Sequence, residues 1–183
     1  MAHKNQLLIG QTALVVVDVQ QAFRDVIPDL ALMVSRIVTA VQGFQILGVP
    51  VIVTEQYPKG LGNTVEEIQR VLINQNSPIE KTTFSGAAPV IEKLKEMQVS
   101  QVVLCGLETH ICVNQTAHDL LEGGFQVHIL TDCVASRSDH NRAAGLAKMS
   151  RSGVIECSTE MALFELMRDA KHDKFKEIQA LIK

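Results

Sequence analysis

The feature of this sequence that most limits its fold is a repeated alternation between short runs rich in β-branched residues and longer helical patterns. The first run, "TALVVVDV" (12–19), is almost wholly apolar and ends near an acid, as expected for a strand buried on both faces. Further strand candidates are "VPVIVTEQ", "IEKTTF", "VSQVVLCG", "FQVHILTD" and "SGVIEC". Helical patterns cover 29–47, 64–73, 87–97, 112–122 and 140–150, and two more follow residue 157. Strands that alternate with helices form right-handed crossovers, so we predict an α/β fold, a three-layer α/β/α sandwich.

Length and charge limit the possible partners of the chain. Its 183 residues are enough to bury a core without disulfides or a structural metal, so we expect a single domain over 1–183. A net charge of -3 gives no basic surface for nucleic acid. No apolar run approaches the roughly 20 residues that cross a bilayer, and the first residues do not resemble a secretory signal. We therefore expect a cytoplasmic protein with a small-molecule substrate and neither a membrane nor a nucleic acid as partner.

Polar residues stand where the predicted strands end. In open α/β sheets, ligands bind outside the carboxyl ends of the strands. The candidates at these ends are Asp18, Glu55, Lys81, the segment 108–112 and Asp132. Acids at such positions also cap turns, so each one alone is a weak indication of function.

Cys112 stands out among four cysteines because a helical pattern begins near it, just after Gly106 interrupts an apolar run. Free N–H groups at a helix start would lower the pKa of a thiol below its usual value of about 8.5, and they could also bind an oxyanion. We expect Cys105, Cys133 and Cys157 to be buried, inert thiols. For Cys112 three interpretations stay open: a nucleophile, a core residue, or a metal ligand beside His110.

A nucleophilic cysteine needs a base and a group that stabilises the resulting charge. Asp18 could accept the thiol proton, and Lys81 is the cationic candidate beside it. The metal interpretation is less well supported, since His110 and Cys112 are two residues apart and the other histidines are scattered singly, without an HxxxH motif.

Three ordered motifs resemble the isochorismatase-like cysteine hydrolases, a superfamily that includes nicotinamidases. They are "VVVDVQQAF", "IEKTTFSGA" and "LCGLETHICVNQTAHDLLEGGFQVHILTDCVASR", and "TEQYPKGLG" is closer to the isochorismatase domain-containing branch. The resemblance runs from about Leu14 to the C-terminus. It implies a doubly wound, mostly parallel six-stranded sheet in the order 3-2-1-4-5-6, and a catalytic triad of Asp18, Lys81 and Cys112. In the implied mechanism Asp18 takes the thiol proton, Lys81 stabilises the charged pair, and Cys112 forms a thioester that water then hydrolyses.

The resemblance also implies further roles around the triad. The backbone N–H groups of Glu108 and Cys112 would form the oxyanion hole, and the peptide before Glu108 would be cis, a conformation that costs about 2.5 to 4 kcal/mol. Gln20 would orient the acid. The expected substrate-binding residues are Gln20, Phe23, Tyr57, Phe84 and His110. Core packing is the alternative for both phenylalanines.

The chain departs from nicotinamidases at the second strand. Those enzymes carry an Asp-x-His metal motif there, whereas this chain has Glu55, Gln56 and Tyr57. One glutamate without histidine partners is a poor transition-metal site, so we expect no metal and no cofactor. Isochorismate cleavage hydrolyses a vinyl ether and does not call for a thiolate. We therefore predict an amidase that hydrolyses an amide-like C–N bond. The alternative is a non-catalytic or redox-responsive interaction protein. The resemblance also implies a homo-oligomer.

Overall fold

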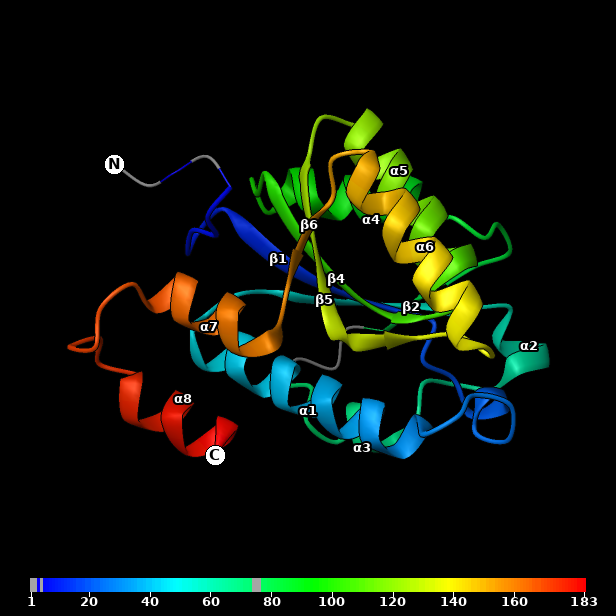
Figure 1. Ribbon diagram of the computed structural model, residues 1–183, viewed down its shortest axis with the longest axis horizontal. Helices are drawn as coiled ribbons and strands as arrows, with labels where there is room; N and C mark the ends of the chain where they lie inside the picture. Colours follow the sequence, from blue (N-terminus) through cyan, green and yellow to red (C-terminus); the bar gives the residue numbers. More distant parts are fainter. Residues whose placement is uncertain (1–2, 4, 74–76) are drawn as a thin grey trace.

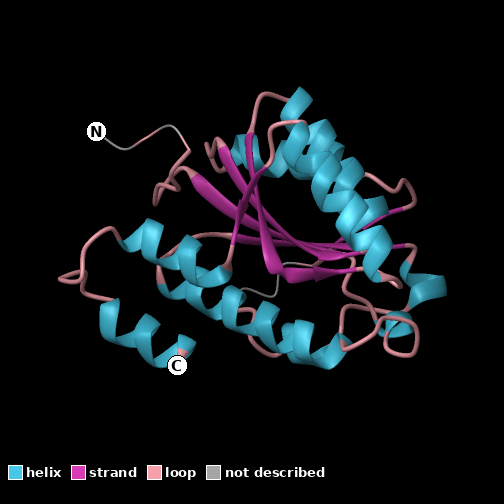
Figure 2. Ribbon diagram, in the orientation of Figure 1, coloured by secondary structure: helices cyan, strands magenta, loops and turns pink. Residues whose placement is uncertain are grey.

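The computed structural model describes residue 3, residues 5–73 and residues 77–183. Six strands form one sheet in the order β3-β2-β1-β4-β5-β6, and every neighbouring pair is parallel (Figure 2). The strands are β1 (Thr12–Val17), β2 (Val51–Gln56), β3 (Ile79–Lys81), β4 (Gln101–Leu107), β5 (Gln126–Ala135) and β6 (Ile155–Cys157). The predicted fold and strand order are confirmed.

Helices cover both faces of the sheet (Figure 1). One layer consists of α1 (Leu30–Ile46), α3 (Glu66–Gln69), α7 (Thr159–Met167) and α8 (Phe175–Ile182). The other consists of α4 (Ala87–Glu96), α5 (Asn114–Glu122) and α6 (Asp139–Arg151). Two apolar cores separate the sheet from these layers, and all six residues of β1 are buried because β1 lies centrally with helices on both sides.

Two short helices and one unusual turn lie in the connections. They are the 3-10 helix η1 (Gln21–Phe23), the helix α2 (Pro58–Leu61) and the π-helical turn η2 (Thr109–Val113), which continues directly into α5. Among the helices of the described ranges, none is long and apolar enough to cross a bilayer. The connections after β1 and β4 are the ones that carry Asp18 and Cys112.

Two predicted helices differ in extent from the structure. The pattern over 64–73 yields only the short helix α3, which ends at Gln69. Before the helix, Thr64 is held in an extended bridge with Gln20. After it, bonds between residues three positions apart form turns as far as Leu72. The helix predicted to start at Cys112 begins at Thr109, as the π-helical turn. Cys112 is therefore inside the first turn and does not begin it.

Candidate active site

The structure brings Asp18, Lys81 and Cys112 to the carboxyl end of the sheet. Asp18 follows β1, Lys81 ends β3, and Cys112 lies in η2 after β4. Lys81 spans β2 to reach Asp18, with 2.6 Å between its Nζ and Asp18 Oδ2 and with side chains only 3% and 1% exposed. Gly86 lies beside the Lys81 methylene chain: a Cβ on residue 86 would be 3.4 Å from Lys81 Cδ and Cε and from the Thr54 methyl carbon, at the short end of ordinary van der Waals contact.

Asp18 is held by β2 as well as by Lys81. Thr54 Oγ1 donates to Asp18 Oδ1 at 2.7 Å, and the Asp18 amide donates to the Thr54 carbonyl at 3.1 Å. The Asp18 backbone is left-handed, with φ 53°, which is unfavourable for a residue with a side chain. These bonds keep the carboxylate in that conformation. Thr54 was not identified from the sequence, although it is a polar residue within the apolar run of β2.

Four oxygen atoms surround the Lys81 ammonium. They belong to Asp18 Oδ2 at 2.6 Å, Gln56 Oε1 at 2.7 Å, the Phe84 carbonyl at 3.0 Å and the Thr83 carbonyl at 3.2 Å. An ammonium group has three protons to donate, so these acceptors occupy it fully. Lys81 is therefore a fixed positive charge, and Gln56 is a second site residue that the sequence alone did not reveal.

The Cys112 side chain is almost covered, and its acidity is lower than expected. The residue is 7% exposed. Burial, followed by the negative charge of Asp18, raises the pKa of Cys112 to about 12, although Lys81 acts in the opposite direction. A hydrogen bond to Asp18 and the charge of Glu108 contribute to the same increase. The prediction of a lowered pKa is therefore wrong: loss of water and two carboxylates outweigh one lysine and a helix start.

The last residue but one of β4 is a glycine. Gly106 has φ 122°, and a Cβ there would collide with the Val17 carbonyl oxygen of the adjacent strand. The expected cis peptide before Glu108 is wrong, since the described residues contain no cis bond. Gly106 has the positive φ that a glycine tolerates, at the register shift of β4 against β5, and Glu108 continues in an extended conformation after the strand ends at Leu107. The oxyanion hole formed by the Glu108 and Cys112 amides stays a prediction.

Gln20 does not hydrogen-bond to the Asp18 carboxylate, which it was expected to orient. Its side chain is fully buried, with Nε2 donating to the carbonyls of Gln56 and Gly62 and Oε1 accepting from the Gln56 amide. The hydrogen-bonded partners of the Asp18 carboxylate are instead Thr54 and Lys81. Gln20 therefore fixes the backbone of Gln56, because its amide is fully used by main-chain groups.

The other expected substrate-binding residues differ in exposure. Tyr57 and Phe84 are each 54% exposed, and the Phe84 carbonyl is one of the acceptors on Lys81. Phe23 is partly buried and packs against the core under α1, which supports the packing alternative for this residue. His110 is partly buried, with its Nδ1 3.0 Å from Ser136 Oγ. Contact of these four residues with a substrate stays a prediction.

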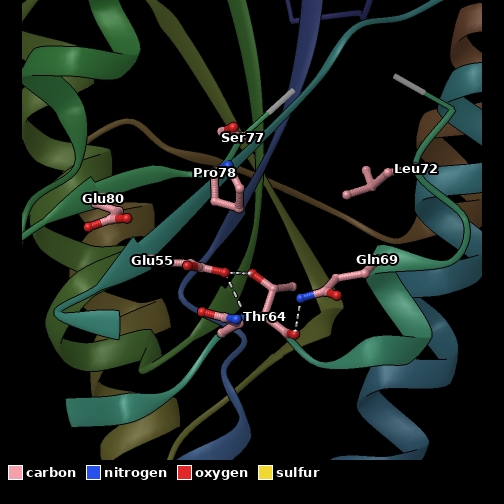
Figure 3. Close-up of a pocket in the computed structure, with 8 residues that line it drawn as sticks. Glu55, Thr64, Gln69, Leu72, Ser77, Pro78 and Glu80 are labelled. Atoms are coloured by element: carbon pink, nitrogen blue, oxygen red, sulfur yellow. Dashed lines mark hydrogen bonds between the residues drawn. The ribbon is translucent and has the colours of Figure 1, made fainter. Parts of the chain in front are cut away.

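Glu55 points away from the triad, into a separate hollow. Its Oε1 accepts hydrogen bonds from the Thr64 amide at 2.6 Å and from Thr64 Oγ1 at 2.7 Å (Figure 3). The hollow has a volume of about 510 Å³, and Gln69 and Glu80 also line it (Figure 3). None of the triad residues lines it. Over the described ranges, no three His, Cys, Asp or Glu side chains are grouped to hold a metal ion.

The remaining cysteines are all buried and unpaired, as predicted. Burial raises the pKa of Cys105 well above its usual value and raises the pKa of Cys133 and of Cys157 to about 12. They lie on the adjacent strands β4, β5 and β6, in the core under α1 and α7. The charges of Asp132 and Arg36 act on Cys133, but its hydrogen-bond partner is the neutral hydroxyl of Thr159.

The chain is similar to several known proteins. A family model described as "Isochorismatase domain" matches residues 12–161. Isochorismatase domain-containing protein 1 of Salmo salar is 45% identical over 97% of this chain, which spans only 62% of that relative's length. Isochorismatase domain-containing protein 2 of Danio rerio is 42% identical, with 100% of this chain and 92% of that protein covered. A solved structure titled "Structure of MAR1 Ribonuclease from Caenorhabditis elegans" has a TM-score of 0.92 and 37% identity, covering 97% of this chain and 92% of that one. With a family model over most of its length and curated relatives of this similarity, the chain belongs to the isochorismatase family.

Proposed function

We propose that this chain is a cysteine hydrolase that cleaves an amide-like C–N bond of a small substrate through a thioester, without a catalytic metal. The observation that carries the proposal is the buried ion pair between Lys81 and Asp18, with 2.6 Å between Nζ and Oδ2, beside the Cys112 thiol. With a pKa of about 12, Cys112 is protonated at neutral pH and needs a base. Asp18 is the base in contact with it.

The first half of the reaction forms the acyl enzyme. Asp18 takes the proton of Cys112 as Sγ attacks the substrate carbonyl carbon, and Lys81 stabilises the charge of the Asp18–Cys112 pair. The amides of Glu108 and Cys112 would hold the oxyanion. When the tetrahedral intermediate collapses, the C–N bond breaks, the amine leaves with the proton from Asp18, and the acyl group stays on Sγ as a thioester.

The second half regenerates the enzyme. Water attacks the thioester carbon while Asp18 accepts one of its protons. The C–S bond then breaks, a carboxylic acid leaves, and the proton on Asp18 returns to Sγ. Because Lys81 already has four acceptors, its charge stays in place throughout both halves.

The high pKa of Cys112 weighs against the redox-responsive alternative. Oxidants react with thiolates, and sensor cysteines combine a low pKa with exposure. Cys112 has neither property, being 7% exposed with a pKa of about 12. The thiol is better suited to a reaction in which the proton leaves only during attack on a bound substrate.

The similar structure from Caenorhabditis elegans carries the word ribonuclease in its title, so RNA belongs in any test. The net charge of -3 is a poor footprint for a phosphate backbone. A buried thiol beside a carboxylate is chemically suited to acyl transfer. We therefore place amide-like substrates first.

The test is a screen of small amides, related acyl compounds and RNA, run with a chelator against the wild type, Cys112→Ala and the matched control Cys133→Ala. We expect one class of amide-like compound to turn over in the wild type and in Cys133→Ala, and turnover to fall about a thousandfold or more in Cys112→Ala. Turnover that survives in Cys112→Ala, or that the chelator abolishes, would overturn the proposal. Cleavage of RNA alone would replace the substrate class.

A further inference from the structure

Glu108 connects the turn that carries Cys112 to a neighbouring loop. Its carbonyl oxygen accepts hydrogen bonds from the amides of Ile111 at 3.0 Å and Val113 at 3.3 Å, the residues on either side of Cys112. Its side chain is only 5% exposed and points to the connection between β5 and α6. One residue thus holds the backbone of the π-helical turn and a buried negative charge.

Arg137 provides the counter-charge for Glu108. Glu108 Oε1 accepts from Arg137 Nε at 2.8 Å and from the Arg137 amide at 3.3 Å. The Arg137 side chain is 58% exposed, so water screens the electrostatic field of its charge. The Glu108 carboxylate, by contrast, is buried. A buried carboxylate with a half-exposed partner keeps part of its negative field.

The second carboxylate oxygen is sealed inside the protein. Oε2 lies 3.2 Å from His110 Nδ1, which is also 3.0 Å from Ser136 Oγ, and it makes no hydrogen bond with any other part of the chain that the structure describes. Helix α6 packs closely on the backbone of the π-helical turn, since a Cβ on Gly145 would lie 2.9 Å from His110 Cα. Because this oxygen has no access to solvent, Glu108 cannot touch a substrate with it. Any effect on the reaction must pass through the turn or through its charge.

We propose that the Glu108–Arg137 ion pair is a positioning element of the site, in which Arg137 holds and partly neutralises Glu108, and the balance of these two charges sets the reactivity of the Cys112 thiol. The proposal rests on the proposed function in taking Cys112 as the nucleophile. Neither residue is assigned contact with the reacting atoms through its side chain.

The direction of the effect follows from the charges around Cys112. The groups that act on the thiol are Asp18 after β1, Lys81 of β3 and Glu108 before its own turn. Glu108 raises the pKa of Cys112, so loss of its charge favours the thiolate. Loss of the Arg137 charge leaves Glu108 less neutralised and has the opposite effect. A purely structural role would predict that both changes act in the same direction.

The experiment measures alkylation of Cys112 by iodoacetamide as a function of pH, followed by peptide mass spectrometry. The variants are Glu108→Gln, Arg137→Met and Arg137→Lys, with Glu55→Gln as the control because it removes another buried carboxylate that is absent from the charges acting on Cys112. We expect Glu108→Gln to react about threefold faster below the pKa of Cys112, and Arg137→Met about threefold slower. Arg137→Lys should stay close to the wild type, as should Glu55→Gln.

Two results would overturn the inference: equal slowing in Glu108→Gln and Arg137→Met, or no change in either when both are folded by circular dichroism. If Arg137→Met does not fold, Arg137→Lys and Glu108→Gln still decide the question, because the inference requires faster alkylation in Glu108→Gln. Failure of the proposed function is separate. It would be seen in the wild type, as no amide turnover and no preference of iodoacetamide for Cys112 over Cys133.

Discussion

Cys112 and Cys133 are two buried thiols of nearly equal acidity in regions of different composition. The pKa of each is raised to about 12, and burial is the largest cause for both. Cys133 contacts a neutral hydroxyl, with 3.2 Å between its Sγ and Thr159 Oγ1. Cys112 instead faces Asp18, which is paired with Lys81. Thiol acidity in the resting protein therefore does not distinguish Cys112 from Cys133. The contact of Cys112 with a base that is paired with a cation does.

The two regions also differ in how they accommodate charge. At the carboxyl ends of β1 and β3, two full charges are buried together and satisfied by hydrogen bonds. On the face of β5 that carries Cys133, His128 is buried with no hydrogen-bond partner in the described structure, and burial lowers its pKa to about 4. His128 is registered beside Val103, a residue of the core under α1. This second region therefore buries an imidazole that is neutral at neutral pH, whereas the region around Cys112 buries a pair of opposite charges.

The largest expected effect separates catalysis from thiol reactivity. In Asp18→Asn the general base is lost, so turnover should fall about a hundred- to ten-thousandfold. The pKa of Cys112 should fall below about 12 at the same time, because the charge of Asp18 and its hydrogen bond both raise it. Alkylation of Cys112 should therefore become faster while hydrolysis becomes slower. Parallel kinetics of both reactions would measure this.

The matched control for that prediction is Asp132→Asn. Asp132 raises the pKa of Cys133 as Asp18 raises that of Cys112, but it has no part in the proposed reaction. Its turnover should equal that of the wild type. If alkylation of Cys112 slows together with turnover in Asp18→Asn, Asp18 does not act on the thiol through its charge.

The next effect concerns the ion pair itself. Lys81→Met leaves the Asp18 carboxylate buried without its counter-charge, which should lower the free energy of unfolding by about 3 to 5 kcal/mol. Urea unfolding at neutral pH would measure the loss. The pKa of Cys112 should rise further, since Lys81 is the group that lowers it.

A double variant tests the cause of that loss. Asp18→Asn combined with Lys81→Met removes both charges and should be more stable than Lys81→Met alone, because no unpaired charge remains. The two side chains are in direct contact, so their effects should not add. A double variant that loses the sum of both single effects would show that packing, rather than charge, accounts for the loss.

The strand pattern was sufficient to place Asp18, Lys81 and Cys112 at one edge of the sheet, because parallel strands align their carboxyl ends. The choice of these three among the strand-end candidates came from the resemblance to a family. Asp18, Lys81 and Cys112 end or follow strands that the topology brings together, and the apolar runs of β1, β2 and β4 were recognisable. The reach of Lys81 across β2 was not predictable from these patterns. It depends on side chains of β2 such as Gln56, which lies 25 positions before Lys81 in the sequence and accepts a hydrogen bond from its ammonium group.

Other features of the site depend on burial, which local patterns do not give. The sign of the Cys112 pKa shift follows first from exclusion of water and then from the charge of Asp18, 94 positions earlier in the chain. Thr54 and Gln56 act through hydrogen bonds across strands. The short α3 begins after Thr64 because the amide and hydroxyl of Thr64 donate hydrogen bonds to Glu55, a residue of the strand before this loop. Propensity alone favoured a longer helix there.

The smallest expected effect concerns His128, the buried histidine on the face of β5 that carries Cys133. The pKa of His128 is about 4 when folded and its ordinary value is 6.5, so the unfolded chain binds this proton first as the pH falls. The contribution of His128 to stability is therefore complete above pH 6.5, is lost progressively between about pH 6.5 and pH 4, and amounts to about 3 kcal/mol.

The variant that tests this linkage is His128→Leu, which replaces an unpartnered imidazole by an apolar side chain of similar size. It should keep its stability at pH 7 and lose less than the wild type on acidification, in urea unfolding at several values of pH. His140→Ala, at an exposed position of α6, should behave like the wild type. Equal acid sensitivity in the wild type, His128→Leu and His140→Ala would mean that protonated His128 has a hydrogen-bond acceptor on its face of the sheet. The contrast between this buried histidine and the paired charges around Cys112 would then not hold.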